Sequence, residues 1–419
     1  MKIPRRDFVK TVVTGAAAGP TLAGLGYSMG KQNASSDHPR HIVVIGAGVF
    51  GAWTAYHLHR AGREVTLLDA YGPSNAHASS GGESRIIRMG YGPDEIYTRS
   101  SMRALALWKQ FFQTLQEPLP LFYQTGVLWL AHENDSNAQA TLATLRKLGV
   151  RHEQMSRQQL AKAYPQCSFA SDAWGIFEPE SGALMARRAV QTLVSEMVRQ
   201  GVGYVQGAAA TPAGHGQLDS VRTQGGETVR ADLFVFACGP WLPKVFPGLL
   251  GNRIFPSRQE VFFFGTPAGD ARYRSPAFPT WLDVVEQVYG FPDLENRGIK
   301  MSWDSHGTAF DPDSGNRQIT PQSVANMREI VAQRFPGLKD APLLETRVCQ
   351  YENTSNGDFL IDRHPDFTNV WLAGGGSGHG FKHGPAVGEY LAARILEGGE
   401  VDPRYSLASK NTVQKRSVY

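Results

Sequence analysis

The clearest indication of the fold is the stretch His41-Ile42-Val43-Val44-Ile45-Gly46-Ala47-Gly48-Val49-Phe50-Gly51. Its first five residues are apolar and mostly β-branched, which is typical of a buried parallel strand, and three glycines follow at the spacing of a dinucleotide-binding turn. In such a turn Gly46 makes the tight bend, Gly48 lets the backbone approach a pyrophosphate, and Gly51 lets a helix pack closely. The helix expected from Ala52 to Arg60 would direct its positive N-terminus at the phosphates.

A second strand and an acidic residue complete the nucleotide-binding pattern. The run from Glu64 to Leu68 predicts a strand, and Asp69 follows it, 23 positions after Gly46. An acid at this place accepts a hydrogen bond from a ribose hydroxyl and disfavours a 2′-phosphate, which argues against NADP. The pattern alone permits either FAD or NAD.

Two later apolar runs also end in glycine. Residues 231–236 lead into Gly239, and residues 369–373 lead into the glycines at 374–376, so both predict strands whose ends approach a ligand. After the second run, residues 377–382 precede an amphipathic helix expected from about Ala386 to Leu396. The positive end of that helix could hold negative charge on a reduced flavin.

Composition limits the classes of function. A chain of 419 residues exceeds the roughly 250–300 residues of a single core, so we expect two packed units. The net charge of +4 arises within residues 1–34, and the rest is neutral without basic clusters, so nucleic acid is not an expected partner. The three cysteines are too few and too far apart to predict a disulfide framework or a metal cluster, so no metal is expected.

The N-terminal segment is interpreted as an address. Arg5-Arg6-Asp7-Phe8-Val9-Lys10 precedes a mild, Gly/Ala-rich stretch from Thr11 to Met29, which matches the twin-arginine export pattern. Residues 1–34 are therefore expected to be removed after passage through the twin-arginine (Tat) export machinery, which would place the protein in the periplasm. The stretch is too weakly apolar to favour an uncleaved anchor, so no stable membrane insertion is expected.

From about His41 to Leu396 the sequence resembles the monomeric sarcosine oxidase family, which includes N-methyltryptophan and pipecolate oxidases among the D-amino-acid-oxidase-like flavoproteins. The most specific segments are Arg347-Val348-Cys349-Gln350-Tyr351, Asp358-Phe359-Leu360-Ile361-Asp362 and Gly378-His379-Gly380-Phe381-Lys382. The resemblance implies that FAD is the cofactor and that Cys349 carries it covalently through the flavin 8α-methyl group. The alternative for Cys349 is one more buried apolar cysteine, as expected for Cys167 and Cys238.

The resemblance also implies roles for the charged residues of the site. In the segment 79–88, Arg85 would lie against the flavin and Arg88 would bind the substrate carboxylate, a task that suits its planar fork. Lys382 matches a second carboxylate ligand. Tyr289 and Lys300, eleven residues later, match a site tyrosine and the lysine that activates oxygen above the flavin. The alternative for Arg85, Arg88 and Lys300 is ordinary exposure at the surface.

Further cofactor contacts follow from the same resemblance and the nucleotide fingerprint. They are Gly46, Gly48, Val49, Phe50, Gly51, Asp69, Ala70, Gly81, Arg85, Ile86, Gly239, Cys349, Gly376, Gly378, Gly380, Phe381 and Lys382.

The sequence departs from the family pattern at two places. Ser80-Gly81 stands where sarcosine oxidases carry a histidine pair, and Asp304 stands where they carry a histidine four positions after the lysine. These departures leave the identity of the substrate open. Asp304 would put a carboxylate near the substrate nitrogen, where it stabilises a cation or accepts its proton; the alternative is a solvated surface acid.

The fold class expected is α/β, with an FAD-binding Rossmann-like domain and a second α+β substrate domain on a mixed or antiparallel sheet. The first would be discontinuous over 38–115, 177–247 and 345–408, and the second would comprise 116–176 and 248–344. Strands of the second sheet are expected at 121–130, 258–264 and 288–303. The polar tail 409–419 is expected to be loose.

These features predict an FAD-dependent oxidoreductase that oxidises the C–N bond of an amino acid, giving an imine and, with O2, hydrogen peroxide. A quinone or protein acceptor would make it a periplasmic dehydrogenase instead. A non-catalytic flavin-binding protein is a further alternative, but it would need none of Arg88, Lys300 and Lys382. The nucleotide fingerprint alone also permits a nicotinamide-dependent dehydrogenase.

Overall fold

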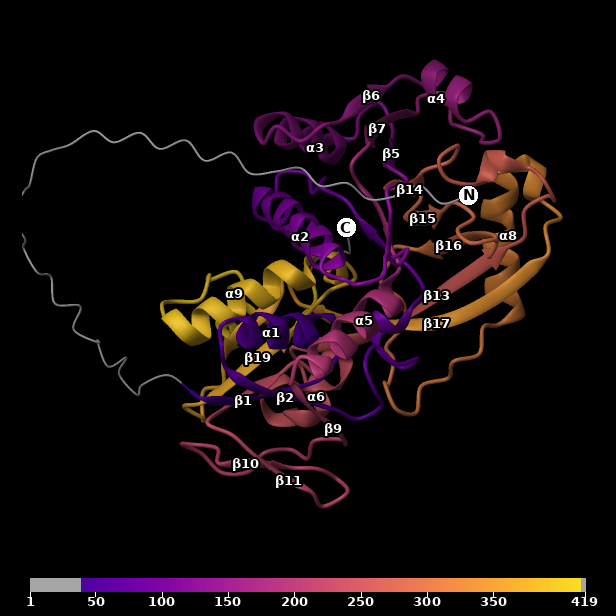
Figure 1. Cartoon of the computed structure of the whole chain (residues 1–419). Helices are drawn as coiled ribbons and strands as arrows, with labels where there is room; N and C mark the ends of the chain where they lie inside the picture. The colour runs from indigo at the N-terminus through magenta and orange to yellow at the C-terminus, as the bar shows by residue number, and fades with distance from the viewer. Residues whose placement is uncertain (1–38, 416–419) are drawn as a thin grey trace, which may run out of the picture. The chain divides into compact units, whose positions relative to one another are not determined.

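The structure is a computed structural model that describes residues 39–415. The expected export signal, residues 1–34, lies outside the described residues. The described chain is built on two large sheets, one of six strands and one of eight, with helices packed against them (Figure 1). No helix between residues 39 and 415 is long and apolar enough to cross a membrane.

The six-stranded sheet has the order β18-β19-β12-β1-β2-β9. Its strands run in parallel except β18, which pairs antiparallel with β19 at one edge. The central strand β1 is almost wholly buried because its β-branched run packs on both faces. The strands are β1 His41–Ile45, β2 Glu64–Asp69, β9 Gly203–Gln206, β12 Leu233–Phe236, β18 Leu360–Arg363 and β19 Val370–Gly374.

Helices cover one face of this sheet, and short elements cover the other. On the first face Trp53, Leu193 and Leu391 meet in one apolar cluster that joins three of the helices. On the other face Phe234 and Phe236 pack with Leu242 and with Val221 of a small hairpin. The first group is α1 Val49–Arg60, α2 Glu95–Gln113, α5 Ala186–Arg199 and α9 Gly384–Glu397; the second is α6 Leu242–Val245, α7 Pro247–Leu250, β10 Ser220–Arg222 and β11 Thr228–Arg230.

The eight-stranded sheet has the order β17-β13-β16-β15-β14-β5-β7-β6 and is mixed, since β14 and β5 are parallel and the other neighbours antiparallel. Its strands are β5 Val127–Ala131, β6 Glu153–Met155, β7 Trp174–Glu178, β13 Ile254–Phe264, β14 Thr280–Asp283, β15 Val288–Phe291, β16 Ile299–Trp303 and β17 Leu343–Thr354. Figure 1 shows β13 and β17 as a long paired ribbon.

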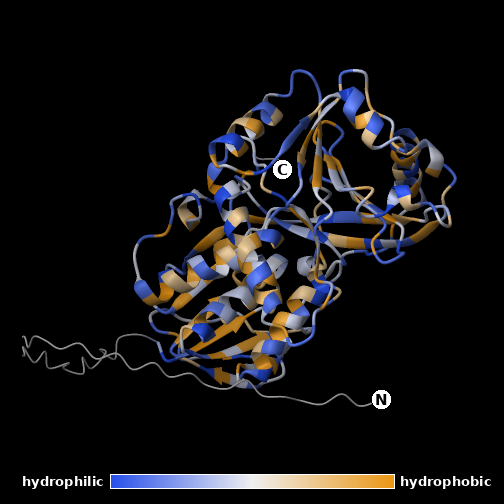
Figure 2. Ribbon diagram, turned by 45° about the horizontal axis from the view of Figure 1, so that its top comes forward, coloured by the Kyte–Doolittle hydropathy of each residue, from blue (hydrophilic) through white to orange (hydrophobic). Residues whose placement is uncertain are grey.

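Smaller elements complete the described chain. Helix α8 Pro321–Arg334 packs Met327 and Val331 against Phe262 and Phe264 of the eight-stranded sheet. The remaining elements are β3 Arg85–Ile87, β4 Phe122–Tyr123, β8 Gly182–Leu184, α3 Ser136–Lys147, α4 Arg157–Ala163, and 3₁₀ turns at Ser79–Gly81, Gly239–Trp241, Ala271–Tyr273, Pro336–Leu338, Phe381–His383 and Leu407–Ser409. Figure 2 shows hydrophobic residues along the strands and hydrophilic residues on the loops.

The fold class predicted from the sequence is confirmed, while its domain bounds stay predictions. One predicted strand is wrong: the run 121–130 breaks at Gly126, whose φ of +71° turns the chain, so β4 and β5 belong to different sheets. Two helices begin elsewhere than expected, α1 at Val49 and α9 at Gly384. The tail also differs, because Lys410 is fully buried and the Asn411 N–H donates to Ser355 Oγ (2.8 Å).

Candidate functional site

The fingerprint turn requires its glycines. Gly46 has φ +105°, and a Cβ there would lie 2.3 Å from the Ala237 carbonyl oxygen. A Cβ on Gly51 would lie 1.8 Å from the Gly46 carbonyl oxygen, so this residue holds α1 close to the strand as predicted. The Val49 N–H, at the start of α1, donates to Ser80 Oγ (3.1 Å). The turn therefore carries strand β1 directly into α1, and the Ser80 hydroxyl meets the first N–H of that helix.

Asp69 stands at the end of β2, beside that turn. Its carboxylate accepts hydrogen bonds from the N–H groups of Ala47 (2.7 Å), Tyr71 (2.9 Å) and Gly72 (2.8 Å). Burial raises the pKa of Asp69, and these three hydrogen bonds oppose the rise. A carboxylate has about four acceptor positions, so one remains for a ligand hydroxyl.

Three cavities adjoin one another along the carboxyl ends of the parallel strands. The outer cavity, about 440 Å³, is lined by Gly46, Asp69 and Trp241 among others. The middle cavity, about 80 Å³, shares Gly48, Ser79, Ser80, Ala237 and Gly239 with it. The inner cavity, about 50 Å³, shares Arg85, Tyr351, Gly378 and Phe381 with the middle one. Ligands of open α/β sheets bind at such strand ends.

Most residues predicted to bind the cofactor line these cavities. Gly46, Gly48, Asp69, Ala70 and Gly239 line the outer one; Val49, Phe50, Arg85, Gly376, Gly378, Gly380 and Phe381 line the middle one; Ile86 and Lys382 line the inner one. As far as residues 39–415 define the linings, Gly51, Gly81 and Cys349 are outside them.

Two buried polar atoms in the middle cavity lack a partner within the described chain. They are Ser79 Oγ and Glu352 Oε2. Glu352 Oε1 accepts a hydrogen bond from the Gly376 N–H (3.2 Å), and burial raises the pKa of Glu352 to about 7 despite that bond. Buried polar groups are almost always paired in native proteins, so a ligand with hydroxyl or other polar groups would fit this cavity.

Arg85 links the loop 79–88 to Cys349. Its guanidinium donates to the carbonyl oxygens of Ser79 (2.6 Å) and Ser84 (2.8 Å), and Nη2 lies 3.2 Å from Cys349 Sγ. Burial would raise the pKa of the Cys349 thiol, but Arg85 and Arg347 outweigh it and hold that pKa below its ordinary value. Cys349 is thus a buried thiol with enhanced thiolate character, as a nucleophile requires.

Arg88 is positioned as a cation in the wall of the inner cavity. It is 3% exposed, and its guanidinium carbon lies 4.4 Å from the centre of the Tyr91 ring and 4.5 Å from that of Trp129. It also donates to the Gly90 carbonyl oxygen. The surface alternative for this arginine is wrong.

A buried carboxylate, that of Glu178, holds the segment that follows Arg88. Glu178 accepts hydrogen bonds from the N–H groups of Met89 (2.7 Å) and Gly90 (2.9 Å) and from Trp129 Nε1 (2.9 Å). These bonds fix both the segment after Arg88 and one of the rings that sandwich it. Sequence reasoning missed Glu178, because only the tertiary fold shows what its side chain contacts.

Lys382 and Asp304 also line the inner cavity. Burial and the neighbouring Arg88 hold the pKa of Lys382 well below its ordinary value, while Asp304 and Glu178 oppose the drop. Asp304 follows β16, and its N–H donates to the Gln287 carbonyl oxygen (2.7 Å). Burial raises the pKa of Asp304 to about 6, although Arg88 and Lys382 pull it down. Two basic side chains and one acid therefore meet around one small space.

Tyr289 and Lys300 lie on the neighbouring strands β15 and β16. Tyr289 lines the inner cavity. Lys300 is 2% exposed, and its Nζ donates to the Ser84 carbonyl oxygen (2.8 Å) and lies 4.4 Å from the centre of the Phe291 ring. The surface alternative for Lys300 is therefore wrong. As far as the described chain defines the cavities, Lys300 contacts Ser84, next to Arg85, and does not itself line the middle or the inner cavity. Burial, aided by Arg85, lowers the pKa of Lys300 strongly.

Tyr351 is a further site residue that the sequence could have indicated. It lines both the middle and the inner cavities. It lies two residues after Cys349 on β17, and alternate residues of a strand share one face. Once Cys349 is a candidate, strand periodicity therefore points to Tyr351 as well.

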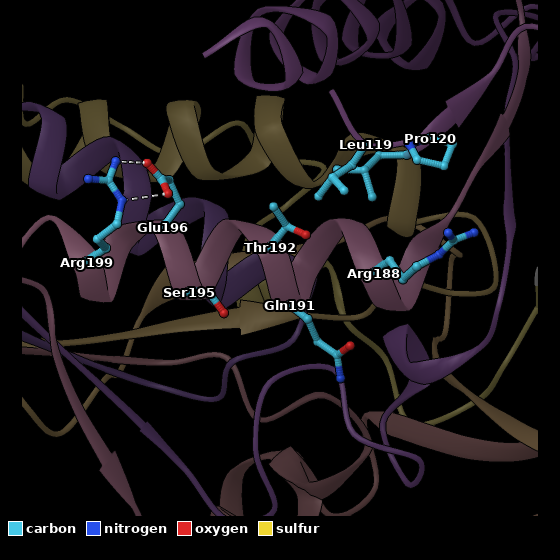
Figure 3. Close-up of a pocket in the computed structure, with 9 residues that line it drawn as sticks. Leu119, Pro120, Arg188, Gln191, Thr192, Ser195, Glu196 and Arg199 are labelled. Atoms are coloured by element: carbon cyan, nitrogen blue, oxygen red, sulfur yellow. Dashed lines mark hydrogen bonds and ion pairs between the residues drawn. The ribbon is translucent and has the colours of Figure 1, made fainter. Parts of the chain in front are cut away.

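A separate hollow of about 370 Å³ lies between α5 and residues 119–121 (Figure 3). Glu196 and Arg199 form an ion pair on its wall. Its described lining shares no residue with the three cavities, and it contains none of the predicted site residues.

The chain is similar to proteins of known family, sequence and structure. The family model described as FAD dependent oxidoreductase (DAO) matches residues 41–394. Monomeric sarcosine oxidase from Bacillus sp. (strain NS-129) is 31% identical over 381 residues, covering 88% of this chain and 96% of that protein. N-methyl-L-tryptophan oxidase of Escherichia coli (strain K12 / DH10B) is 28% identical, covering 84% of this chain and 93% of that protein. A fructosyl peptide oxidase mutant shares the fold with a TM-score of 0.74 at 22% identity, over 88% of this chain and 93% of that one.

Proposed function

The chain belongs to the family of FAD dependent oxidoreductases, and from this premise we propose that it oxidises the C–N bond of a carboxylate-bearing secondary or primary amine. The observation that carries the proposal is the inner cavity, where Arg88, Lys382 and Asp304 converge beside the middle cavity. The names of the relatives, sarcosine oxidase and N-methyl-L-tryptophan oxidase, specify amino acids as substrates of those proteins and support it. Loss of the visible flavin absorbance on anaerobic mixing with an amino acid tests it.

The three connected cavities fit FAD. The outer cavity, with the fingerprint turn and Asp69, would hold the adenosine and pyrophosphate parts, and the unpaired Ser79 Oγ and Glu352 Oε2 would meet polar groups in the middle cavity. Arg85, between the middle and inner cavities, would lie against the flavin. Bound FAD supplies the acceptor for the hydride that leaves the substrate carbon.

The chain's own residues bind and orient the substrate. The guanidinium of Arg88 and the ammonium of Lys382 offer two cationic donors to a carboxylate, and both are buried, so the attraction is little screened by water. Asp304, facing both cations, offers an oxygen to the substrate nitrogen and accepts its proton to leave the reactive neutral amine. Held at both ends, the substrate presents its Cα–H in one orientation. Hydrolysis of the imine product follows in water.

The Asp304→Asn substitution should abolish the fall of kcat/KM at acid pH. The pKa of Asp304 is about 6, so its carboxylate is present above that pH and lost below it, and kcat/KM of the native protein should fall as the pH drops through about 6. The variant should lack this limb and be slower by about 10²-fold above it, the usual contribution of a general base. Profiles of kcat/KM between acid and neutral pH check this. A limb that survives in Asp304→Asn but disappears in Glu352→Gln would reassign it to Glu352.

We also propose that FAD is attached through Cys349. The proximity of Arg85 and the lowered pKa of the thiol support this, because the thiolate is the nucleophilic form of cysteine and Cys349 would hold the flavin through its sulfur. After acid precipitation the native protein should keep its yellow colour in the pellet, while Cys349→Ser should release its flavin. Cys238→Ser, a cysteine beside the outer cavity, is the matched control and should retain attachment. Free flavin from the native protein would contradict attachment.

Export by the twin-arginine route remains a proposal, supported by Arg5, Arg6 and the stretch that follows. Fractionation of cells that produce the full chain, with Arg5 and Arg6 both changed to Lys in the variant, tests it. Periplasmic protein that disappears in the variant supports export, and equal distribution of both proteins contradicts it.

A further inference from the structure

A line of buried polar groups leads from the inner cavity to the surface of α2. Lys382 Nζ donates to the Tyr91 hydroxyl (2.7 Å), which lies 2.8 Å from His383 Nε2, and His383 Nδ1 lies 2.9 Å from Ser100 Oγ. Lys382, Tyr91 and His383 are at most 4% exposed. Ser100 is half-buried on α2 and follows the exposed Arg99. The line thus joins a substrate-binding cation to solvent in three hydrogen bonds.

Each member between the ends both donates and accepts a proton. The hydroxyls of Tyr91 and Ser100 do so by rotation, and the imidazole of His383 does so through its two nitrogens. His379 adds a second imidazole beside Tyr91, with Nδ1 3.2 Å from the hydroxyl and Nε2 3.0 Å from the Gly357 carbonyl oxygen. That carbonyl only accepts, so Nε2 of a neutral His379 donates to it and Nδ1 is an acceptor.

The charges around the line favour proton exchange at Lys382. This residue faces Arg88, Asp304, Glu178 and His383, and burial together with Arg88 lowers the pKa of its ammonium. Burial, followed by the effects of Lys382, His379 and Arg88, lowers the pKa of His383 as well. A bound carboxylate would reverse the balance at Lys382, because an anion stabilises the ammonium form. At a pH between the pKa of Lys382 in the empty site and its pKa in the occupied site, binding of the carboxylate must therefore be accompanied by uptake of one proton.

We propose that Tyr91, His383 and Ser100 form a relay that carries a proton from solvent to Lys382 when a substrate carboxylate binds. The inference rests on the proposed function, which places that carboxylate on Arg88 and Lys382. In the inward step the Tyr91 hydroxyl turns its hydrogen from His379 Nδ1 to the neutral Nζ of Lys382, gives that hydrogen to Nζ and takes one from His383 Nε2. His383 Nδ1 takes the hydrogen of Ser100, and Ser100 takes one from water. Four hydrogens each move one place, no electron is transferred, and one proton leaves the solvent.

If a relay residue is replaced, binding of a carboxylate and uptake of the proton should proceed at different rates. Propionate is the probe, mixed with the FAD-loaded protein in weakly buffered solution at mildly alkaline pH. Flavin absorbance reports binding, and a pH indicator dye reports proton uptake. In the native protein both signals should develop together, with up to one proton per site. In His383→Phe, whose ring fits the aromatic surroundings of Tyr97 and Phe359, uptake should lag by about 10²-fold.

Two further variants keep the test decisive. Ser100→Ala cuts the line at its solvent end without touching the core and should also delay uptake, whereas Ser100→Thr keeps a hydroxyl and should restore it. His57→Phe is the matched control, because this histidine bonds to the Pro385 carbonyl oxygen outside the line. Unchanged uptake rates in His383→Phe and Ser100→Ala, or binding without uptake in the native protein, would overturn the relay. If propionate leaves the native flavin spectrum unchanged, the carboxylate site itself fails, and with it the proposed function.

Discussion

Replacing Arg88 with methionine should lower kcat/KM for an amino acid substrate by roughly 10²–10³-fold, since truncating one partner of a buried charge pair costs about 2–5 kcal/mol. Methionine can fill the space between the rings of Tyr91 and Trp129 but brings no charge. Arg88→Lys should lose less, because it keeps a cation without the planar fork that meets both carboxylate oxygens. Steady-state kinetics over a range of amino acid concentrations measure the loss.

The comparison of two substrates gives this prediction its specificity. The matched amine that lacks the carboxylate should react slowly with the native protein and no more slowly with Arg88→Met, because Arg88 then has nothing to bind. Arg99→Met, at an arginine whose side chain is 63% exposed, is the control for the substitution itself. An equal loss of rate for the amino acid and the amine would assign Arg88 a structural role and contradict carboxylate binding.

The second large effect is expected at Lys300. Lys300→Met should slow the reaction of the reduced protein with O2 by about 10²–10³-fold, the usual cost of removing one electrostatic stabiliser of a charged transition state. Reduction by the amino acid should change much less. Stopped-flow reduction and re-oxidation, followed separately through the flavin absorbance, measure the two halves. Lys147→Met, at a lysine whose side chain is 68% exposed, is the control.

The pH dependence of the oxygen reaction gives a second readout. Burial lowers the pKa of Lys300, and only its ammonium form would stabilise the negative charge that develops on O2. The rate of re-oxidation by O2 should therefore be highest at low pH and fall as the pH rises through that lowered pKa. Unchanged re-oxidation in Lys300→Met would contradict the role. Slow re-oxidation of the native protein by O2 with fast re-oxidation by a quinone would favour the dehydrogenase alternative.

Local sequence signals predicted the strand β1, the glycine turn and the helix that follows it well. The strand, turn and helix around Gly46 depend on contacts between near neighbours, so their residue pattern carries the structure. Asp69 could be placed at the end of β2, but its three backbone partners could not be foreseen, because they depend on the path of the turn. The break at Gly126 was missed because the apolar residues on both sides of Gln124-Thr125-Gly126 were taken as one strand, although a glycine within a strand pattern signals a local break.

The arrangement of residues around the inner cavity was harder to predict, because it depends on contacts between segments that are far apart in the sequence. Arg85 and Cys349 are 264 residues apart in the chain, and they meet because β17 lies against the loop 79–88 in the fold. The relay through Tyr91 and His383 joins segments separated by 292 residues. The burial of Lys410 likewise depends on packing that a polar tail sequence conceals. The resemblance to a family indicated Arg88 and Lys382, whereas residues that support them, such as Glu178, could be identified only from the fold.

Anaerobic mixing of the FAD-loaded protein with a panel of amino acids tests whether this chain oxidises the C–N bond of a carboxylate-bearing amine. The panel includes sarcosine, N-methyltryptophan, pipecolate and proline, each paired with the matching amine that lacks the carboxylate. At least one amino acid should bleach the visible flavin absorbance, and the matching amine without the carboxylate should do so far more slowly. A flavin that stays yellow with every amino acid, or a purified protein without flavin, would contradict the proposed function.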